Sequence, residues 1–326
     1  MQLQVDELQV EDQQPLIIDA IDPAGASPRL SAASGLVTRQ GRAYVVVDDE
    51  RHLAVFDANG VGRWLRLFGG ELPDDAARRK ADKPDLETLI ELPASEALPF
   101  GSLLGLASGS RPNRHAAVVL AFDAAGEVTG APRHLDLTPL YAPLRQRFGE
   151  LNIEGGLVLG DTFMLLQRAN RGEARNVCIR FAWREVQAWL MNHRMATPQV
   201  LAFDDHDLGH MDGVPLGFTD AAAVPGGHWL FCAVAEDTSD SYQDGPCAGT
   251  AIGCVDAIGT MRSLWRLSGN WKAEGLAAAL GADGDSLALT LVTDADDRAR
   301  NAMLLTVRMS LSAALKPASR PRRRRP

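Results

Sequence analysis

The chain has 326 residues, of which 46% are hydrophobic and 23% charged, a composition typical of folded globular proteins that excludes a disordered body. Its formal net charge of −9 at pH 7 disfavours binding to nucleic acid, whose phosphates attract basic surfaces. Residues 1–11 are polar and acidic, and no apolar run reaches the length of about 18 residues that spans a membrane, so we expect a cytoplasmic protein without signal peptide or membrane contact.

Two apolar segments, residues 2–5 and 15–19, precede any longer apolar run, and the last strand-like run of the chain ends near Met309. Because the final group of strands there numbers only three, we expect one of the two N-terminal segments to supply its fourth strand. Such a closure leaves no open sheet edge. Removal of residues 1–19 is therefore predicted to unfold the protein.

A short pattern recurs five times: a hydroxyl or acidic residue, then one or two small or apolar residues, then a hydrophobic run. The markers are Ser34, Glu87, Glu154, Asp212 and Glu274, and the successive intervals are 53, 67, 58 and 62 residues. A β-propeller blade has about 40 to 50 residues before loop insertions. We therefore predict an all-β fold, a five-bladed β-propeller whose inner strands begin near the markers.

Within each module, apolar strands alternate with turn-forming segments such as Asn59-Gly60, a strong hairpin signal. The strands expected from this alternation are residues 34–38, 43–47, 52–56, 103–107, 116–122, 162–167, 177–181, 229–234 and 286–292.

Helical periodicity is confined to residues 139–148 and 183–192, which we interpret as insertions outside the ring of strands. An alternative is a six-bladed propeller in which residues 183–207 contribute the additional blade. Residues 1–314 are expected to form a single domain in either case.

Four of the five markers are carboxylates, so a propeller would gather them around its central channel. Clustered carboxylates repel one another and require a partner. Calcium is one such partner, since it accepts six to eight oxygen ligands at roughly 2.3 to 2.6 Å. Lys83, Arg168 and Lys272 are rival partners that could neutralise the ring without metal. The predicted metal ligands are Glu87, Glu154, Asp212 and Glu274.

A second layer of charged and polar residues is expected in the loops that join the second and third strands of the blades. Basic groups beside acidic ones suit an anionic ligand held next to a cation. Residues 235–246 form the longest and most polar of these loops and are a candidate lid or recognition loop. We expect a monomer that binds a small anionic ligand or a protein partner at the channel mouth. The predicted ligand-binding residues are Arg168, Asn170, Arg171, Glu236 and Asp294.

The cysteines and histidines give no zinc signature. The four cysteines include no CxxC pair and lie in or beside apolar runs, which predicts buried free thiols. His206 and His210 are four residues apart in a loop-like segment, a spacing that does not favour a zinc site there. The basic segment 315–326 holds six Lys or Arg residues and no acid, and is expected to be a disordered tail.

The segments Asp85-Leu86-Glu87, Ile153-Glu154-Gly155 and Ala273-Glu274-Gly275-Leu276 resemble the D-x-E-G-[LI] inner-strand motif of the phytase-like and esterase-like propeller families and of calcium-activated nucleotidase propellers. The resemblance implies an uncharacterised bacterial member of that group. It also implies that Glu87, Glu154 and Glu274 face the channel and take part in calcium binding. The first marker departs from the motif, because Ser34 stands where the acid is expected.

Two functions from different classes follow. The first is a calcium-dependent hydrolase of a phosphate or carboxyl ester, in which the cation polarises a substrate oxygen and Arg168 or Arg171 anchors an anionic group. The alternative is a non-catalytic propeller that binds a ligand or a protein. The sequence contains no G-x-S-x-G elbow, P-loop or H-E-x-x-H motif, so those catalytic classes are not favoured.

Overall fold

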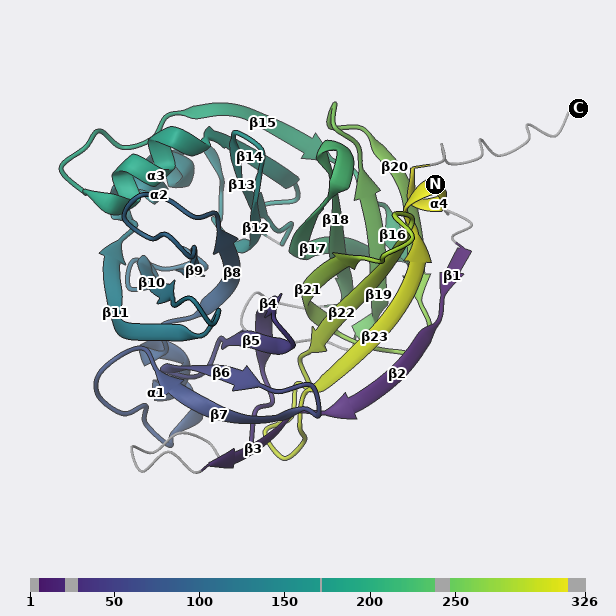
Figure 1. Cartoon of the computed structure of the whole chain (residues 1–326), viewed down its shortest axis with the longest axis horizontal. Helices are drawn as coiled ribbons and strands as arrows, with labels where there is room; N and C mark the ends of the chain where they lie inside the picture. Colours follow the sequence, from purple (N-terminus) through teal and green to yellow (C-terminus); the bar gives the residue numbers. More distant parts are fainter. Residues whose placement is uncertain (1–5, 21–28, 171, 238–246, 316–326) are drawn as a thin grey trace, which may run out of the picture.

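The computed structural model describes residues 6–20, 29–170, 172–237 and 247–315, and these form five β-sheets arranged as blades around a central channel (Figure 1). Each inner strand contacts the inner strand of the next blade, and the fifth contacts the first, so the ring is closed. The five-bladed propeller predicted from the sequence is thereby confirmed. The inner strands, in blade order, are β4 (Ala33–Arg39), β8 (Leu86–Leu92), β12 (Ile153–Leu159), β17 (Val214–Val224) and β21 (Ala273–Leu280).

The remaining strands of each blade follow outward from the inner strand in antiparallel order, and each strand expected from the sequence is among them or among the inner strands. They are β5 (Arg42–Val47), β6 (His52–Phe56) and β7 (Val61–Arg66) in the first blade, β9 (Ser102–Ala107), β10 (Ala116–Phe122) and β11 (Val128–Asp136) in the second, β13 (Thr162–Gln167), β14 (Asn176–Ala182) and β15 (Val200–His206) in the third, β18 (His228–Glu236), β19 (Cys247–Val255) and β20 (Met261–Leu267) in the fourth, and β22 (Ser286–Thr293) and β23 (Met303–Ser310) in the fifth.

Helices are short and lie between strands. The two predicted helical segments are α2 (Thr138–Arg147), before β12, and α3 (Trp183–Met191), between β14 and β15. The six-bladed alternative is wrong, because residues 183–207 supply α3 and the outer strand β15 of the third blade. Three further elements, α1 (Ala76–Asp82), η1 (Pro225–Gly227) and α4 (Leu311–Ala314), complete the set of described helices. None of the described helices is both long and apolar enough to cross a membrane.

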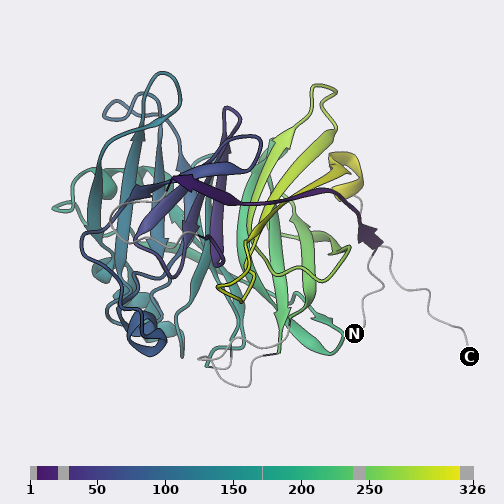
Figure 2. The same ribbon diagram turned by 90° about the horizontal axis from the view of Figure 1, so that it is seen from below.

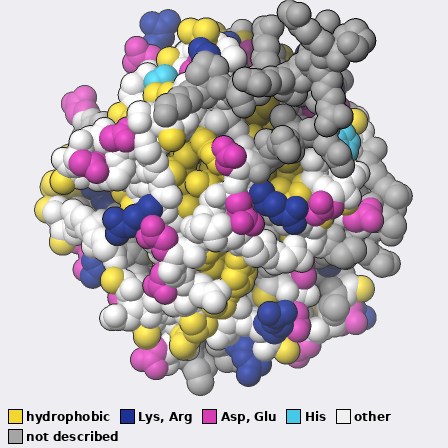
Figure 3. All heavy atoms as spheres, turned by 90° about the vertical axis from the view of Figure 1, so that its right-hand side faces the viewer, with side chains coloured by type: hydrophobic (Ala, Val, Ile, Leu, Met, Phe, Trp, Pro, Cys, Tyr) yellow, Lys and Arg dark blue, Asp and Glu magenta, His cyan; other side chains and the backbone are white. Residues whose placement is uncertain are grey.

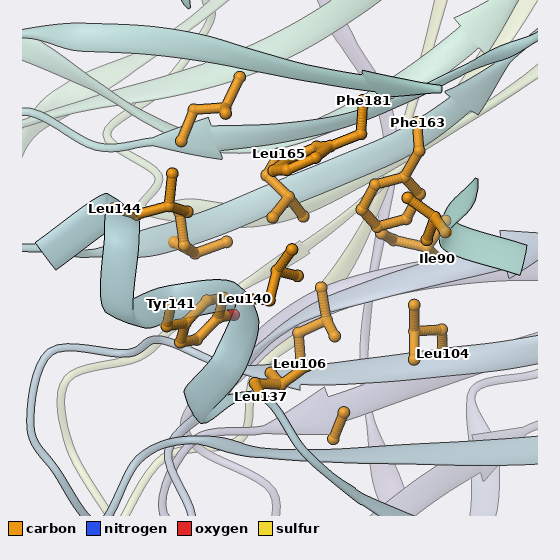
Figure 4. Close-up of a cluster of buried hydrophobic side chains, with 14 of the residues drawn as sticks. Ile90, Leu104, Leu106, Leu137, Leu140, Tyr141, Leu144, Phe163, Leu165 and Phe181 are labelled. Atoms are coloured by element: carbon orange, nitrogen blue, oxygen red, sulfur yellow. The ribbon is translucent and has the colours of Figure 1, made fainter. Parts of the chain in front are cut away.

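The hydrophobic core lies between neighbouring blades. The largest such cluster joins the second and third blades, where Ile90 and Leu104 meet Phe163 and Leu165 (Figure 4). Helix α2 covers this junction with buried apolar side chains, including Tyr141, whose hydroxyl donates a hydrogen bond to the carbonyl of Ala107 at 2.8 Å. Blades covered on both faces explain why the inner strands are continuous apolar runs.

The N-terminal segment forms a strap across the outside of three blades (Figure 2). Strand β1 (Asp6–Leu8) pairs in parallel with β20, β2 (Val10–Pro15) pairs antiparallel with β23, and β3 (Ile17–Ala20) pairs in parallel with β7. The strand that completes the last blade is therefore β2. The predicted closure by an N-terminal strand is thus confirmed, but the strand differs from the segments named: of residues 15–19 only Pro15 belongs to β2, whereas residues 17–19 lie in β3 of the first blade, and residues 2–5 lie outside the described part of the chain.

Strand β2 was not recognised as the closing strand because it has little hydrophobic character. Four of the six side chains of β2 are exposed, and its pairing with β23 is made by the backbone. On the side of the molecule seen in Figure 3, acidic and basic side chains are interspersed with hydrophobic ones. The predicted basic tail falls almost entirely outside the described residues, which end at Leu315.

Candidate functional site

Each inner strand contains one extra residue, a β-bulge, at the same level of the channel. The pairing skips Glu87 between Leu86 and Thr88, and corresponding shifts occur in the other four inner strands. A bulge bends its strand and redirects a side chain. The bulge residues that make up this ring are Ser34 with Gly35, Glu87, Glu154, Thr219 and Glu274.

Asp212 is not a member of the ring, so its prediction as a channel ligand is wrong. It lies in the tight turn between β16 (His210–Met211) and β17, with a φ of 52°. Its side chain is 62% exposed and pairs with Arg266 at 3.0 Å. Because Asp212 lies in the hairpin turn before β17, the bulge of this inner strand comes seven residues later, at Thr219. Thr219 donates a hydrogen bond to the carbonyl of Ala273 on the next blade at 2.9 Å.

The first charged cluster lies at the first and second blades. The Nζ atom of Lys83 contacts Asp48 and lies 2.9 Å from Asp85, which also pairs with Arg114 at 2.8 Å. Asp48, Asp85 and Glu87 each offer one carboxylate oxygen, and the three oxygens lie within 4.8 Å of one another. Glu87 forms no hydrogen bond or ion pair with any residue that the structure describes. This cluster therefore contains an acid without a counter-charge of its own.

The second cluster joins the third, fourth and fifth blades through Arg168, whose guanidinium lies 3.5 Å from Glu154, 3.0 Å from Glu236 and 3.6 Å from Glu274. Arg168 follows β13, whereas these three acids come from β12, β18 and β21. The structure thus brings together three acids that are far apart in the sequence around one cation.

Lys272 extends this cluster in the fifth blade. Its Nζ atom lies 3.1 Å from Asp294, 2.6 Å from Asp296 and 3.3 Å from Glu236. Eight acids and four basic residues thus meet at this end of the channel, which we call the charged mouth. The acids are Asp48, Asp85, Glu87, Glu154, Glu236, Glu274, Asp294 and Asp296, and the bases are Lys83, Arg114, Arg168 and Lys272.

Burial raises the pKa of several acids of the charged mouth. Burial raises the pKa of Glu87 well above its usual range, and the nearby charges of Glu154 and Asp85 raise it further. Burial likewise raises the pKa of Glu274 well above normal, although Arg168 lies beside it. Burial raises the pKa of Asp294 to about 6 against the lowering effect of Lys272. A cation that binds Glu87 would therefore compete with protonation of that carboxylate.

The pKa of Asp85 shifts in the opposite direction to those of Glu87, Glu274 and Asp294. Burial acts to raise its pKa, but the charges of Lys83 and Arg114 and a hydrogen bond from Ser108 hold that pKa below its usual value. Asp85 is therefore a permanent negative charge in the first cluster. Neither of the two other carboxylates there has this degree of stabilisation.

The structure places the predicted ligand-binding residues in different environments. Arg168, Glu236 and Asp294 belong to the charged mouth. Asn170 instead closes its own loop, because its side chain accepts a hydrogen bond from the backbone N–H of Glu173 at 2.8 Å. Arg171 and residues 238–246 of the candidate lid lie outside the described residues.

The sequence reasoning missed Thr219, which belongs to the ring, and its neighbour Asp220. Their signal was available: Thr219-Asp220 precedes the run Ala221-Ala222-Ala223-Val224, the same pattern as the other markers. With Thr219 in place of Asp212, the last two intervals become 65 and 55 residues. Asp220 is fully buried and accepts hydrogen bonds from the backbone of three inner strands.

The thiols and histidines do not form a second site. Three of the four free cysteines are buried and Cys247 is half-buried. Burial raises the pKa of Cys247 and of Cys254 to about 11, which suppresses the reactive thiolate. His206 packs edge-on against Phe218 and Trp229, and among the described residues the group with the spacing to hold a metal ion is Asp48, Asp85 and Glu87.

The chain belongs to a family described as a family of unknown function (DUF6929), which matches residues 29–309. No curated protein matches the sequence. The family match supports the expectation of an uncharacterised protein, and the comparisons give no support to the resemblance to phytase-like and esterase-like propellers.

Solved structures show only distant likeness. The hydrazine synthase of Kuenenia stuttgartiensis is 12% identical over 84% of this chain, with a TM-score of 0.37, and this chain spans 59% of that one. The GH93 α-L-arabinofuranosidase of Fusarium graminearum is 11% identical over 93% of this chain and 99% of its own, with a TM-score of 0.41. A member of the duf4221 family from Bacteroides vulgatus is 10% identical over 93% and 98%, with a TM-score of 0.40. These likenesses are too weak to carry an argument about activity.

Proposed function

We propose that this member of DUF6929 is a binding propeller whose charged mouth holds a divalent cation, with calcium as the first candidate, at Asp48, Asp85 and Glu87. One observation carries the proposal: three carboxylate oxygens lie within 4.8 Å of one another, and Glu87 forms no hydrogen bond or ion pair with any described residue, although the charge of Lys83 acts on it. Oxygens that share a calcium ion at roughly 2.3 to 2.6 Å lie at most about 5 Å apart. The spacing of these three oxygens is compatible with that limit.

Lys83 is the competitor for this position, because its ammonium contacts Asp48 and Asp85. A lysine is a flexible point charge on a four-carbon stem and can withdraw when a divalent ion arrives. The ion would then be neutralised by three carboxylates, including the otherwise unpaired Glu87. Backbone carbonyls and water would complete its coordination.

The excess of acids favours a cationic ligand over the anionic one expected from the sequence. Arg168 is surrounded by Glu154, Glu236 and Glu274, and Lys272 also pairs with several acids. Neither cation is therefore available to anchor a phosphate or carboxylate. For this reason a non-catalytic binding protein has more support than a calcium-dependent ester hydrolase.

Thermal unfolding of chelator-treated protein with calcium, magnesium and manganese tests the proposal. An ion at a hundredfold excess over its Kd stabilises the fold by about 2.7 kcal/mol, which corresponds to several degrees. We expect calcium to raise the Tm of the native protein and of Glu96→Gln, a control with an exposed side chain on the same blade, but not of Glu87→Gln.

Two outcomes would reject the cation site: no Tm change in the native protein at millimolar calcium, or an undiminished change in Glu87→Gln. A panel of phosphate and carboxyl esters addresses catalysis separately. We expect no hydrolysis above that of Glu87→Gln; calcium-dependent turnover that this variant abolishes would favour the hydrolase instead.

A further inference from the structure

The channel opens at its opposite end into an apolar funnel with a volume of about 340 Å³. All five inner strands contribute three consecutive residues to its wall, and Pro93 completes it. Glu91 is the one charged residue in the lining, and its carboxylate pairs with Arg39. The strand segments that line this funnel are residues 36–38, 89–91, 156–158, 221–223 and 276–278.

The wall of the funnel is a set of free strand edges. In the lining segments each inner strand pairs with the second strand of its own blade and with no other described strand. Backbone N–H and C=O groups on the other edge therefore face the channel, as the N–H groups of Leu36 and Leu276 do where they reach Asp220. A molecule in the funnel would meet apolar side chains interrupted by backbone donors and acceptors.

The inner strands converge beneath the funnel. A Cβ atom on Gly155 would lie 2.8 Å from the Cα of Asp220, so only glycine permits this approach of β12 to β17. The carboxylate of Asp220 connects β4 and β21 at the same level. The funnel therefore ends at Asp220 and is separate from the charged mouth.

We propose that this funnel is a second binding site, which takes a small, uncharged and mainly apolar molecule with hydrogen-bonding groups. Its volume is within the range of roughly 300 to 1,000 Å³ typical of small-molecule sites. A charged ligand would be buried without a free counter-charge, which is costly. This site does not depend on the cation proposed above.

Titration with N-phenyl-1-naphthylamine, a neutral apolar probe whose fluorescence rises on burial, tests the site. We expect saturable binding of one probe per chain and weaker binding of the anionic probe 1-anilinonaphthalene-8-sulfonate. The variant Ala223→Phe with Ala278→Phe fills the funnel from its lip and should weaken probe binding by about tenfold or more. Ala125→Phe adds the same ring at an exposed turn after β10, outside the funnel, and should leave binding unchanged.

Methyl NMR of the native protein provides a measurement that needs no variant. The probe should shift the resonances of Leu36, Leu89 and Leu276, which line the funnel. Undiminished binding in the filled variant, or shifts confined to other methyl groups, would overturn the proposal. Self-association of the native protein that the filled variant abolishes would also overturn it, because the occupant would then be a second copy of the chain.

Discussion

The carboxylate of Asp220 on β17 accepts a hydrogen bond from the backbone N–H of Leu276 on β21 at 2.9 Å. The same oxygen accepts the N–H of Leu36 on β4 at 3.4 Å, and the other oxygen accepts the N–H of Ala221 at 2.8 Å. Burial raises the pKa of Asp220 well above its usual range, although these three hydrogen bonds act to lower it. One side chain thus joins the fourth, fifth and first blades at the channel axis.

Asp220→Leu should destabilise the fold strongly. It keeps the approximate size of the side chain but leaves buried N–H groups without an acceptor, each at a cost of about 1 to 3 kcal/mol. Asp220→Asn retains one acceptor oxygen and should lose less stability. Urea unfolding of both variants, with Asp212→Asn as an exposed control, measures the difference. Equal stability of Asp220→Leu and the native protein would refute this role.

Arg168→Gln should destabilise the protein by about 3 kcal/mol or more, because it leaves three buried carboxylates without their shared cation. Arg175→Gln is the matched control: its side chain is 40% exposed, it pairs with Glu173, and its loss should cost less than about 1 kcal/mol. Adding Glu274→Gln to Arg168→Gln should restore part of the stability. Similar losses in the two arginine variants would show that the second cluster contributes little.

The stability of the metal-free protein should fall as the pH rises from about 4 to about 7 through the contribution of Asp49 and Asp294. Burial, followed by repulsion from Asp48, raises the pKa of Asp49 to about 7, and burial raises that of Asp294 to about 6. In this interval the folded state binds more protons than the unfolded state, so the free energy of unfolding decreases with pH.

Urea unfolding of the native protein and Asp49→Asn between about pH 5 and pH 8 tests this sign. The variant should show a smaller decrease with pH. The comparison is needed because burial lowers the pKa of His206, which by itself makes stability fall as the pH drops below about 6.5. Parallel pH profiles for the two proteins would contradict the prediction.

Deletion of residues 1–19 should abolish cooperative unfolding, because it removes β1, β2 and most of β3 and leaves the outer edges of three blades open. Deletion of residues 316–326 serves as the control and should leave the Tm unchanged. A synthetic peptide of residues 6–20 should restore part of the structure when added in trans. A soluble, cooperatively melting protein without residues 1–19 would show that the strap is dispensable.

Four of the five inner strands could be located from the sequence to within one residue, since β4, β8, β12 and β21 begin one position before Ser34, Glu87, Glu154 and Glu274. These strands are covered on both faces, so burial requires hydrophobic residues along them. Such continuous apolar runs are easy to recognise in the sequence. The start of the fourth, β17 at Val214, was predicted to within two residues, but its bulge at Thr219 was not, because the turn at Asp212 has the same residue types as the marker. At Asp212 these residue types are explained by the geometry of the turn, and not by a place in the channel.

The side-chain pairings at the charged mouth were harder to predict from the sequence than the strands. Lys83, Arg168 and Lys272 could be named as rivals for the acids, but Arg168 meets Glu154, Glu236 and Glu274 only because three blades converge on it. Closure by an N-terminal strand was predicted correctly, but β2 was not identified as that strand. Strand β2 is held by backbone hydrogen bonds to β23. Because these bonds depend little on residue type, the sequence gives almost no sign of them.

The central claim, a cation site at Asp48, Asp85 and Glu87, is tested most directly by isothermal titration of calcium into chelator-treated protein at about pH 6 and about pH 8. We predict one ion per chain, with tighter binding at the higher pH because the ion displaces protons from carboxylates whose pKa values burial has raised. Glu96→Gln should retain this binding and Glu87→Gln should lose it. Absence of binding by the native protein at both pH values, or equal affinity in Glu87→Gln, would contradict the claim.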